Sequence, residues 1–384
     1  MQAQVQRGVP LVVGQPQSTA SQRLAAEMPY KSSLRFRTAY PVLSLYYRAM
    51  GRFPVLGRFL LAQNRRERDV MKYAATSTAL ARLYEYPGFL GALKENRGNP
   101  WPAFWSFLNE NCQNARDVRY RTWMAVDLLV SAIQDGAVNL IDLAAGSALA
   151  PWLAMSRTGF SGRWVLIDYA IHSVDNQYRA AAKTGMLGRI TIEPALVLDQ
   201  PTLRNGKLVE IGKRAEKLRW KLNKDLGLSL TLEQFIDLRP VAPGTLYDRI
   251  RLGARVVPIV GDAQTLLPFL GDGHGFDFAS ILGFLDYLDP DETVRDLQQT
   301  HLLLRHGGTL AAALMAPNAE ISGDTGEKHS FVRNVPWYYA AKMGLHLKPK
   351  TDEHFVRMVR ESGYEVKRLL RTPSGVYNII VATV

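Results

Sequence analysis

The sequence has little cysteine, no long apolar run and no recognisable export signal. Cys112 is the only cysteine in 384 residues, which excludes an internal disulfide framework and any metal site built from several cysteines. No apolar run reaches the roughly 18 residues that a membrane-spanning helix needs, and residues 1–20 lack the basic start and apolar core of a signal peptide. These absences favour a reducing compartment, and we expect a cytoplasmic protein.

Several common catalytic motifs are also missing. The chain has no Gly-x-Ser-x-Gly elbow, no His-Glu-x-x-His zinc motif, no GxxxxGK phosphate loop and no internal repeat. Basic residues, in contrast, are in excess: 47 Lys and Arg against 35 Asp and Glu give a net charge of +12. This excess indicates an anionic partner such as nucleic acid, phospholipid or an acidic substrate, although a solubilising surface accounts for it equally well.

The first third of the chain differs from the rest. Residues 1–30 are rich in Gln, Ser, Ala and Pro, and we expect a disordered leader. Residues 31–135 have a helical rhythm, which predicts a helical N-terminal cap. Between residues 31 and 72, arginines alternate with aromatic residues and leucines. This pattern is typical of a basic face for a membrane or an anionic substrate, but also of a packed cap with solvated arginines.

From Val138 onward, short apolar segments alternate with helical ones, which predicts a Rossmann-like, doubly wound and mostly parallel α/β sheet over residues 136–384. The final segments, 364–370 and 377–381, have so short a link that they must be antiparallel, so the sheet is mixed at one edge. Residues 185–253 interrupt the alternation as a largely helical, basic insertion. The earlier strands are expected at residues 138–143, 163–168, 255–260, 276–282 and 309–315.

The stretch 139–153 organises this part of the chain. A strand that contains Asp142 runs into five small residues before a helix begins: Ala144, Ala145, Gly146, Ser147 and Ala148. A small-residue turn lets a ligand approach the backbone, and ligands of open α/β sheets bind outside the carboxyl ends of the strands. Asp168 ends the next strand, where a carboxylate can accept both ribose hydroxyls. Tight packing alone also requires small residues, and such acids also cap helices.

In this order and spacing, the segment from about Val138 to Val384 resembles the class I S-adenosylmethionine-dependent methyltransferases. Asp142 and the turn after it match the first motif of that family, and Asp168 matches the acid of the second. Asp262-Ala263, an acid before a small residue, matches the third. The chain departs from the family in keeping one of three turn glycines, with alanines at the flanking positions.

The resemblance implies a site for S-adenosyl-L-methionine (SAM) and methyl transfer to a small-molecule acceptor by in-line displacement, with no metal. A general base is required only when the acceptor must lose a proton. The candidate bases are Asp286, Tyr287, His329 and Tyr338. The residues implied for the cofactor are Asp142, Ala144, Gly146, Ala148, Asp168, Tyr169, Asp262, Ala263, Gln264, Leu282 and Gly283.

Other interpretations remain open. A nicotinamide dehydrogenase would also have an acid about 20 residues after the turn. The negative charge of Asp142, however, would repel a pyrophosphate and attract a positive sulfonium. The basic N-terminal helices are compatible with a lipid or membrane-bound acceptor and a peripheral membrane location, or with a homodimer. The alanines of the turn are compatible with a non-catalytic SAM-binding protein. No specific nucleic-acid partner is predicted.

Overall fold

The computed structural model describes residues 12–14, 88–110, 113–199, 207–242, 246, 255–266, 275–317, 348–372 and 376–384. Its strands are β1 (Val12–Gly14), β2 (Asn139–Leu143), β3 (Arg163–Asp168), β4 (Ala195–Leu198), β5 (Ile236–Val241), β6 (Val256–Val260), β7 (Phe276–Ile281), β8 (Leu304–Met315), β9 (Glu365–Arg371) and β10 (Tyr377–Thr383).

The described helices flank these strands. They are α6 (Gly88–Glu95), α7 (Pro100–Glu110), α8 (Gln113–Gln134), α9 (Leu149–Thr158), α10 (Ile171–Lys183), α11 (Lys207–Leu226), α12 (Leu232–Phe235), α14 (Ala263–Leu266), the 3-10 turn η3 (Leu285–Tyr287), α15 (Pro290–Leu303) and α18 (Asp352–Glu361). Among them, none combines the length and the apolar character that crossing a lipid bilayer requires.

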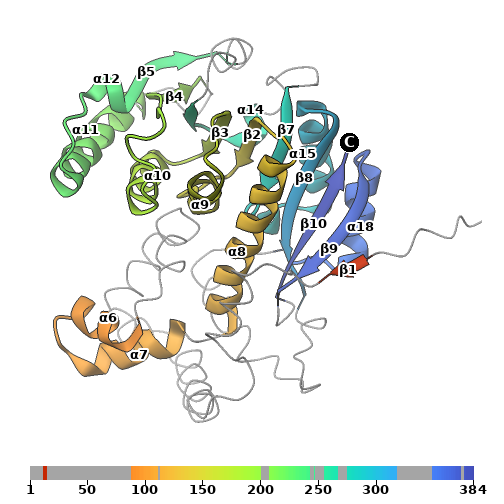
Figure 1. The fold of residues 1–384 in the computed structure, drawn as a ribbon, viewed down its shortest axis with the longest axis horizontal. Coiled ribbons are helices and arrows are strands. Elements are labelled where there is room, and N and C mark those ends of the chain that lie inside the picture. Colours follow the sequence, from red (N-terminus) through yellow and green to blue (C-terminus); the bar gives the residue numbers. More distant parts are fainter. Residues whose placement is uncertain are drawn as a thin grey trace, which may run out of the picture.

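All the described strands form one sheet in the order β1-β9-β10-β8-β7-β2-β3-β6-β4-β5 (Figure 1). Strand β10 runs antiparallel to both β8 and β9, and the other paired strands are parallel. The predicted mostly parallel, doubly wound sheet with an antiparallel edge is therefore confirmed. Strand β2 lies between β3 and β7, so the chain reverses direction across the sheet there, and such a switch point forms a ligand crevice.

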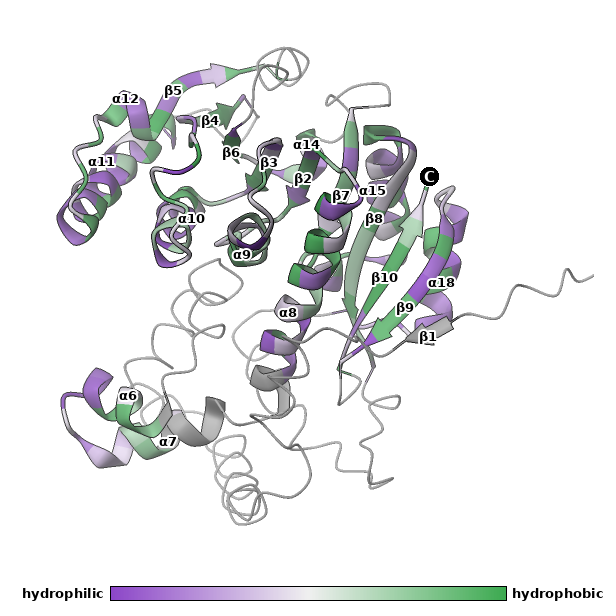
Figure 2. Ribbon diagram, viewed as in Figure 1, coloured by the Kyte–Doolittle hydropathy of each residue, from purple (hydrophilic) through white to green (hydrophobic). Residues whose placement is uncertain are grey.

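Helices cover both faces of the sheet and bury its apolar side chains. On one face, Ile141 and Val165 pack in a cluster with Phe355 of α18. On the other face, Trp164 packs with Met124 of α8 and Trp152 of α9. Strands covered on both sides read as continuous apolar runs, and Figure 2 shows the central strands mainly in hydrophobic colours. This explains why the strands of the parallel core were predictable.

The 185–253 insertion does more than add a helix. Strands β4 and β5 extend the sheet beyond β6, and α11 and α12 pack on them through a cluster that includes Val197, Leu222 and Phe235. The sequence analysis missed both strands because β4 has only four residues and β5 contains Arg239-Pro240. The described part of the insertion is therefore a side layer of the sheet.

Further comparisons with the sequence concern the N-terminal residues, the end of α15 and the helical cap. Within the segment expected as a leader, Val12–Gly14 pairs in parallel with β9. The pair Gly307-Gly308 in the sequence is typical of a helix end, but α15 already ends at Leu303. Strand β8 begins directly after it, and a register shift against β7 accommodates the two glycines. The described part of the predicted helical cap, which begins at residue 88, contains α6, α7 and α8, and residues 31–87 of the cap lie outside the described residues.

Candidate functional site

The turn between β2 and α9 has a left-handed backbone at three positions. Ala144, Gly146 and Ala148 have φ angles of 57°, 58° and 51°. Glycine adopts this conformation freely, but each alanine costs about 1–2 kcal/mol there. Among the described residues, Arg97 is the only other non-glycine with a positive φ. The turn keeps the conformation of a glycine-rich loop without its glycines, and such stored strain is most often found at functional sites.

Asp168, at the end of β3, holds this turn in place. Its Oδ2 accepts the N–H of Gly146 at 2.9 Å, and its Oδ1 accepts the N–H of Ala170 at 3.0 Å. The Ala145 N–H donates to the Ile167 carbonyl at 2.8 Å. The Gln177 side-chain amide of α10 donates to the Gly146 carbonyl at 3.3 Å. The turn is therefore fixed to β3 and α10 and not only to its own strand.

A small hollow opens beside the turn, at the carboxyl ends of β2 and β7. Its volume is about 40 Å³, and it is lined by six of the predicted cofactor residues: Asp142, Ala144, Gly146, Ala148, Leu282 and Gly283. This volume holds a water molecule or two and lies far below the roughly 300–1,000 Å³ of typical ligand pockets. A nucleoside-sized ligand would therefore extend well beyond this hollow.

Two carboxylates lie close together at this end of the sheet. The pKa of Asp142 is raised to about 7, mainly by burial and to a lesser extent by the negative charge of Asp168, while the nearby Ser280 side chain opposes the shift. Burial likewise raises the pKa of Asp168, against the hydrogen bonds from Ala170 and Gly146. The negative charge of Asp168 disfavours ionisation of Asp142, and a cationic ligand group would relieve this repulsion. The site is therefore suited to a ligand that carries positive charge.

Unpartnered polar atoms also point to a ligand at this turn. Ser147 is one of the residues that line the hollow, and its buried hydroxyl has no hydrogen-bond partner in the structure. The Gln177 side-chain carbonyl, behind the turn, also lacks one. Each such atom costs about 1–3 kcal/mol, which a hydrogen-bonding ligand recovers. Buried acids fit the positive ammonium and sulfonium groups at the methionine end of SAM, and an unpaired hydroxyl fits its hydrogen-bonding groups, so these residues fit the cofactor that the sequence implies.

The predicted residues after β3 and β6 lie outside this hollow. Tyr169 follows Asp168 with 66 % of its surface exposed. Asp262 accepts the N–H of Gln264 at 3.0 Å and so caps α14, the helix-capping alternative that the sequence left open. The Gln264 side chain donates to Asp296 of α15 at 3.0 Å, and Ala263 is buried. Contacts of these four residues with adenosine stay predictions.

Asp286 has the contacts of a structural residue. It is buried, its Oδ1 accepts the Met315 N–H at 2.6 Å and its carbonyl accepts the Lys348 N–H at 2.7 Å. Burial raises its pKa, and the charges of Arg121 and Lys350 oppose the shift. A role as general base stays a prediction for Asp286. It also stays one for the half-buried Tyr287, for His329 and for Tyr338, the last two of which lie outside the described residues.

Sequence reasoning missed the contribution of α8. Arg121 and Thr122 line the hollow, and the Arg121 guanidinium lies 4.5 Å from the centre of the Tyr377 ring. A Cβ placed on Gly283 would meet Arg121 Nη2 at 3.7 Å. A signal was present, because Arg121 precedes the buried Ala125 and Leu128 by four and seven residues and so lies on the apolar stripe of the helix.

A larger hollow of about 770 Å³ lies at the opposite ends of the strands. It is lined by residues near the starts of β4, β5 and β6, among them Leu196, Ile236 and Val257. Its charged residues include two ion pairs, Arg255 with Glu193 and Arg239 with Asp237. Ligands of open α/β sheets bind at the carboxyl ends of strands, so size alone does not make this hollow the site.

Comparison with known proteins gives likeness of fold. No family model and no curated protein matches the chain. It is similar to the structure of a possible exported protein from Bordetella parapertussis, at 13% identity, 96% and 99% coverage of the two chains and a TM-score of 0.54.

Two other similar structures come from methyltransferases. An O-methyltransferase family protein from Burkholderia thailandensis is 13% identical, with coverage of 73% of this chain and 61% of that one and a TM-score of 0.39. Magnesium protoporphyrin IX methyltransferase from Synechocystis, with bound S-adenosylhomocysteine, is 12% identical, with 71% and 87% coverage and a TM-score of 0.37. By its strand order and its antiparallel edge, the described chain has the Rossmann-like fold typical of class I SAM-dependent methyltransferases.

Proposed function

We propose that this chain binds SAM and transfers a methyl group to a small-molecule acceptor. The observation that carries the proposal is the turn after β2, which is left-handed at Ala144, Gly146 and Ala148 despite the cost to two alanines. Asp168 holds that conformation, and Ser147, whose buried hydroxyl is unpaired, is one of the residues that line the hollow beside it. Packing alone explains small residues, but it explains neither the strain nor the unpaired hydroxyl.

The residues of the chain would mainly bind and orient the cofactor and the acceptor. SAM, when bound, supplies a methyl group already activated by the positive sulfonium. Asp142 and Asp168 would balance positive charge, and the Ser147 hydroxyl would gain a hydrogen-bond partner. Holding two reactants in line supplies much of the acceleration in such a transfer, so no strong base is needed unless the acceptor loses a proton.

The test is calorimetric titration with S-adenosylhomocysteine, with NADH as the comparison ligand. We expect one site per chain for S-adenosylhomocysteine and no heat with NADH. Gly146→Val should abolish the binding, because a branched side chain is strained at a φ of 58°. Gly188→Val is the matched control, since Gly188 has a φ of 79° in open surroundings away from the hollow.

The outcome also separates the alternatives. NADH binding without S-adenosylhomocysteine binding would contradict the proposal and favour the dehydrogenase interpretation. Cofactor binding with no methyl transfer to any acceptor, lipids included, would leave a non-catalytic SAM-binding protein. The structure gives a reason to consider a non-catalytic protein, because Ala144 and Ala148 line the hollow at positions where the family pattern has glycine.

A further inference from the structure

Helix α11 carries a line of basic residues on the side that faces away from the sheet. Its inward side is buried through Ala215 and Leu222. The outward side exposes what we name the lysine strip: Lys213, Lys217, Trp220, Lys221 and Lys224. Figure 1 places α11 at the edge of the described part of the molecule, and in Figure 2 much of its ribbon has hydrophilic colours. The strip is therefore accessible along the length of the helix.

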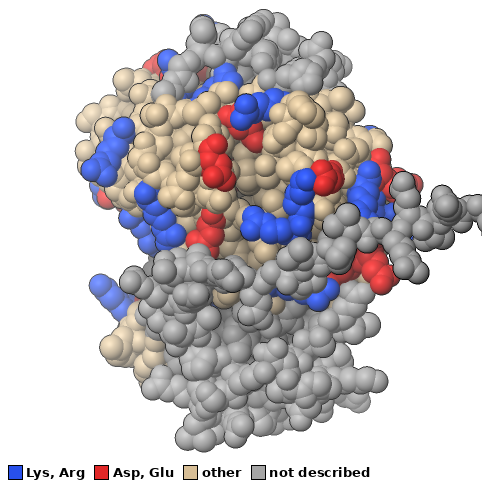
Figure 3. Space-filling model, turned by 45° about the vertical axis from the view of Figure 1, so that its right-hand side comes forward, with Lys and Arg blue, Asp and Glu red and all other residues tan. Residues whose placement is uncertain are grey.

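The positive charge of the strip is not balanced locally. Each acid of α11 is already paired with an arginine: Glu210 with Arg214, Glu216 with Arg219 and Asp225 with Arg179 of α10. The four lysines of the strip make no ion pair with any described residue. On the face shown in Figure 3, by contrast, acidic and basic side chains are interspersed. The strip is a local concentration of positive charge.

Keeping this arrangement costs the helix stability. Lys213, Lys217 and Lys221 follow one another at intervals of four residues, so their like charges are neighbours and repel. Trp220 lies among them with 61 % of its surface exposed, and the Lys224 ammonium is 5.4 Å from the centre of its ring. Large exposed aromatic rings beside cations are typical of a contact surface and not of a solvated face.

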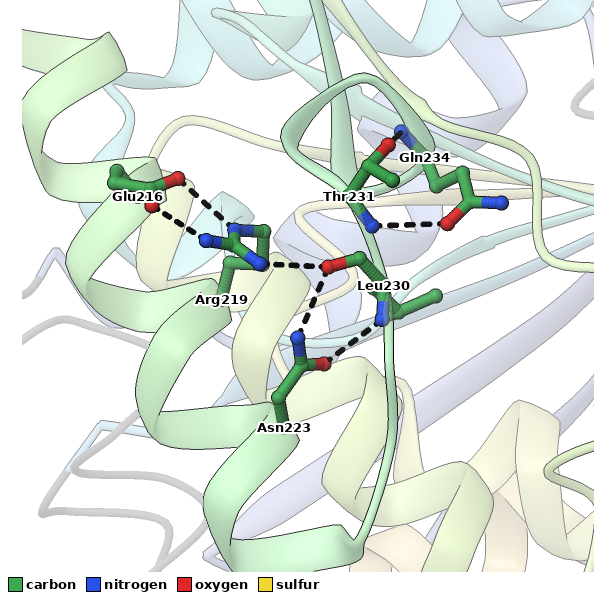
Figure 4. Close-up of polar contacts among 6 residues, drawn as sticks. All are labelled: Glu216, Arg219, Asn223, Leu230, Thr231 and Gln234. Atoms are coloured by element: carbon green, nitrogen blue, oxygen red, sulfur yellow. Dashed lines mark hydrogen bonds and ion pairs between the residues drawn. The ribbon is translucent and has the colours of Figure 1, made fainter.

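Helix α11 is also rigidly attached to the rest of the insertion. The Asn223 side chain donates to the Leu230 carbonyl at 2.9 Å and accepts its N–H at 3.1 Å, and Arg219 donates to the same carbonyl at 2.7 Å (Figure 4). Thr231 and Gln234 close a capping box at the start of α12. The strip is therefore presented in a fixed orientation, and its partner meets a preformed surface.

We propose that the lysine strip docks the protein on an anionic phospholipid surface. A 20-residue helix presents a nearly straight edge about 30 Å long, which suits a flat surface. Tryptophan is the side chain that favours the level of the lipid headgroups, and lysines beside it meet the phosphates. The apolar side of α11 is buried in the protein, so the helix rests on the surface without inserting, and the docking is electrostatic and reversible.

Vesicle sedimentation of the full chain tests this proposal. The probes are phosphatidylcholine vesicles with and without phosphatidylglycerol, at low and high salt. We expect binding only with phosphatidylglycerol, and weaker binding as salt rises. Lys217→Glu/Lys224→Glu should weaken it by more than about 25-fold, since each lysine near an anionic surface contributes about fivefold. Both positions are exposed, and the acidic side chain introduced at position 217 relieves the repulsion along the strip, so the variant should fold normally.

Arg357→Glu/Arg360→Glu on α18 is the matched control. Both arginines are exposed on the far side of the molecule, and the double substitution makes the same change in net charge (Figure 1). The control should bind vesicles within about twofold of the wild type. Equal losses in both variants would contradict the proposal, because net charge and not the strip would then drive binding. Binding to duplex DNA in place of vesicles would also overturn it.

Tryptophan fluorescence provides a second measurement. Vesicles with phosphatidylglycerol should shift the emission of the wild type to shorter wavelength, and Trp220→Phe should remove that shift. If Trp220→Phe keeps the whole shift, the strip does not face the lipid and the proposal fails. Neither measurement depends on cofactor binding, so the result is independent of the proposed function.

Discussion

Asp168 has a structural role besides the ribose contact that the resemblance implies. Its two oxygens accept the N–H groups of Gly146 and Ala170. Asp168→Ala should therefore lower the free energy of unfolding by about 1–3 kcal/mol as well as weaken S-adenosylhomocysteine binding. Urea unfolding and calorimetry measure the two effects. Asp168→Asn keeps one acceptor and should lose less of each. Unchanged stability in the alanine variant would show that the turn keeps its conformation without the hydrogen bonds to Asp168.

Substitutions of Asp286 distinguish a structural role of this carboxylate from a role as general base. It is buried between the charges of Arg121 and Lys350 and accepts the Met315 N–H. Asp286→Ala would remove the acceptor of the Met315 N–H and the negative charge near Arg121 and Lys350, and we expect a loss of about 1–3 kcal/mol in the free energy of unfolding.

The control is Asp286→Asn, which keeps an acceptor for the backbone and should remain folded with most of its turnover. If Asp286→Asn is stable but inactive, the carboxylate acts in the reaction and the structural interpretation is wrong.

The buried Asp142 makes stability depend on pH in a defined direction. Its pKa is about 7 in the folded chain, against the ordinary aspartate value of 3.8. Between these values the folded state holds a proton that the unfolded state has lost, so stability falls as pH rises from about 4 to 7 and levels off above it. Asp142→Asn should remove a drop of about 2 kcal/mol between about pH 5 and pH 7.

Chemical unfolding at a series of pH values measures the effect for the wild type and for Asp142→Asn. Asp168 acts in the same direction in both proteins, so the difference between the two curves isolates Asp142. Parallel curves would mean that Asp142 is ionised throughout this range.

The turn after β2 is the element on which the site depends. Ala148 has a φ of 51° and directly precedes α9 without a side-chain cap. Ala148→Gly releases the backbone strain but increases the conformational entropy of the unfolded chain. These effects oppose each other, so the free energy of unfolding should change by less than about 1 kcal/mol. Ala148→Val places a branched side chain in the same conformation and should cost about 2 kcal/mol or more. Equal stability of the two variants in urea would mean that the turn is not left-handed at this position.

Local chemistry made some elements predictable. The strand and the helix on either side of Gly146 can be predicted from the local order of apolar and small residues. The start of α15 has a local signal too, because Asp289 and Glu292 form a capping box around Pro290, with the Asp289 N–H donated to Glu292 at 2.9 Å. Other features depend on distant partners. Strand β4 exists because β6 and β5 flank it, and Arg121 reaches the site only because α8 packs across the sheet. No local pattern contains that information.

The two proposed binding surfaces, the hollow beside the turn and the lysine strip, lie on different parts of the molecule. The sheet brings Arg121, Asp142 and Gly283, which are far apart in sequence, to one hollow at the carboxyl ends of its central strands. The insertion extends the same sheet on one side and carries the lysine strip on its outer helix (Figure 1). Binding of a cofactor and docking on an anionic surface can therefore occur together, without competition for one surface.

Amide hydrogen exchange with and without S-adenosylhomocysteine tests most directly whether the turn is the cofactor site. The account predicts slower exchange at residues 144–150, 168–170 and 282–283, because ligand contacts suppress the opening of these segments. Residues 193–196 and 232–239, around the larger hollow, should exchange at the same rate in both samples. Protection of the larger hollow with no change at the turn would contradict the account.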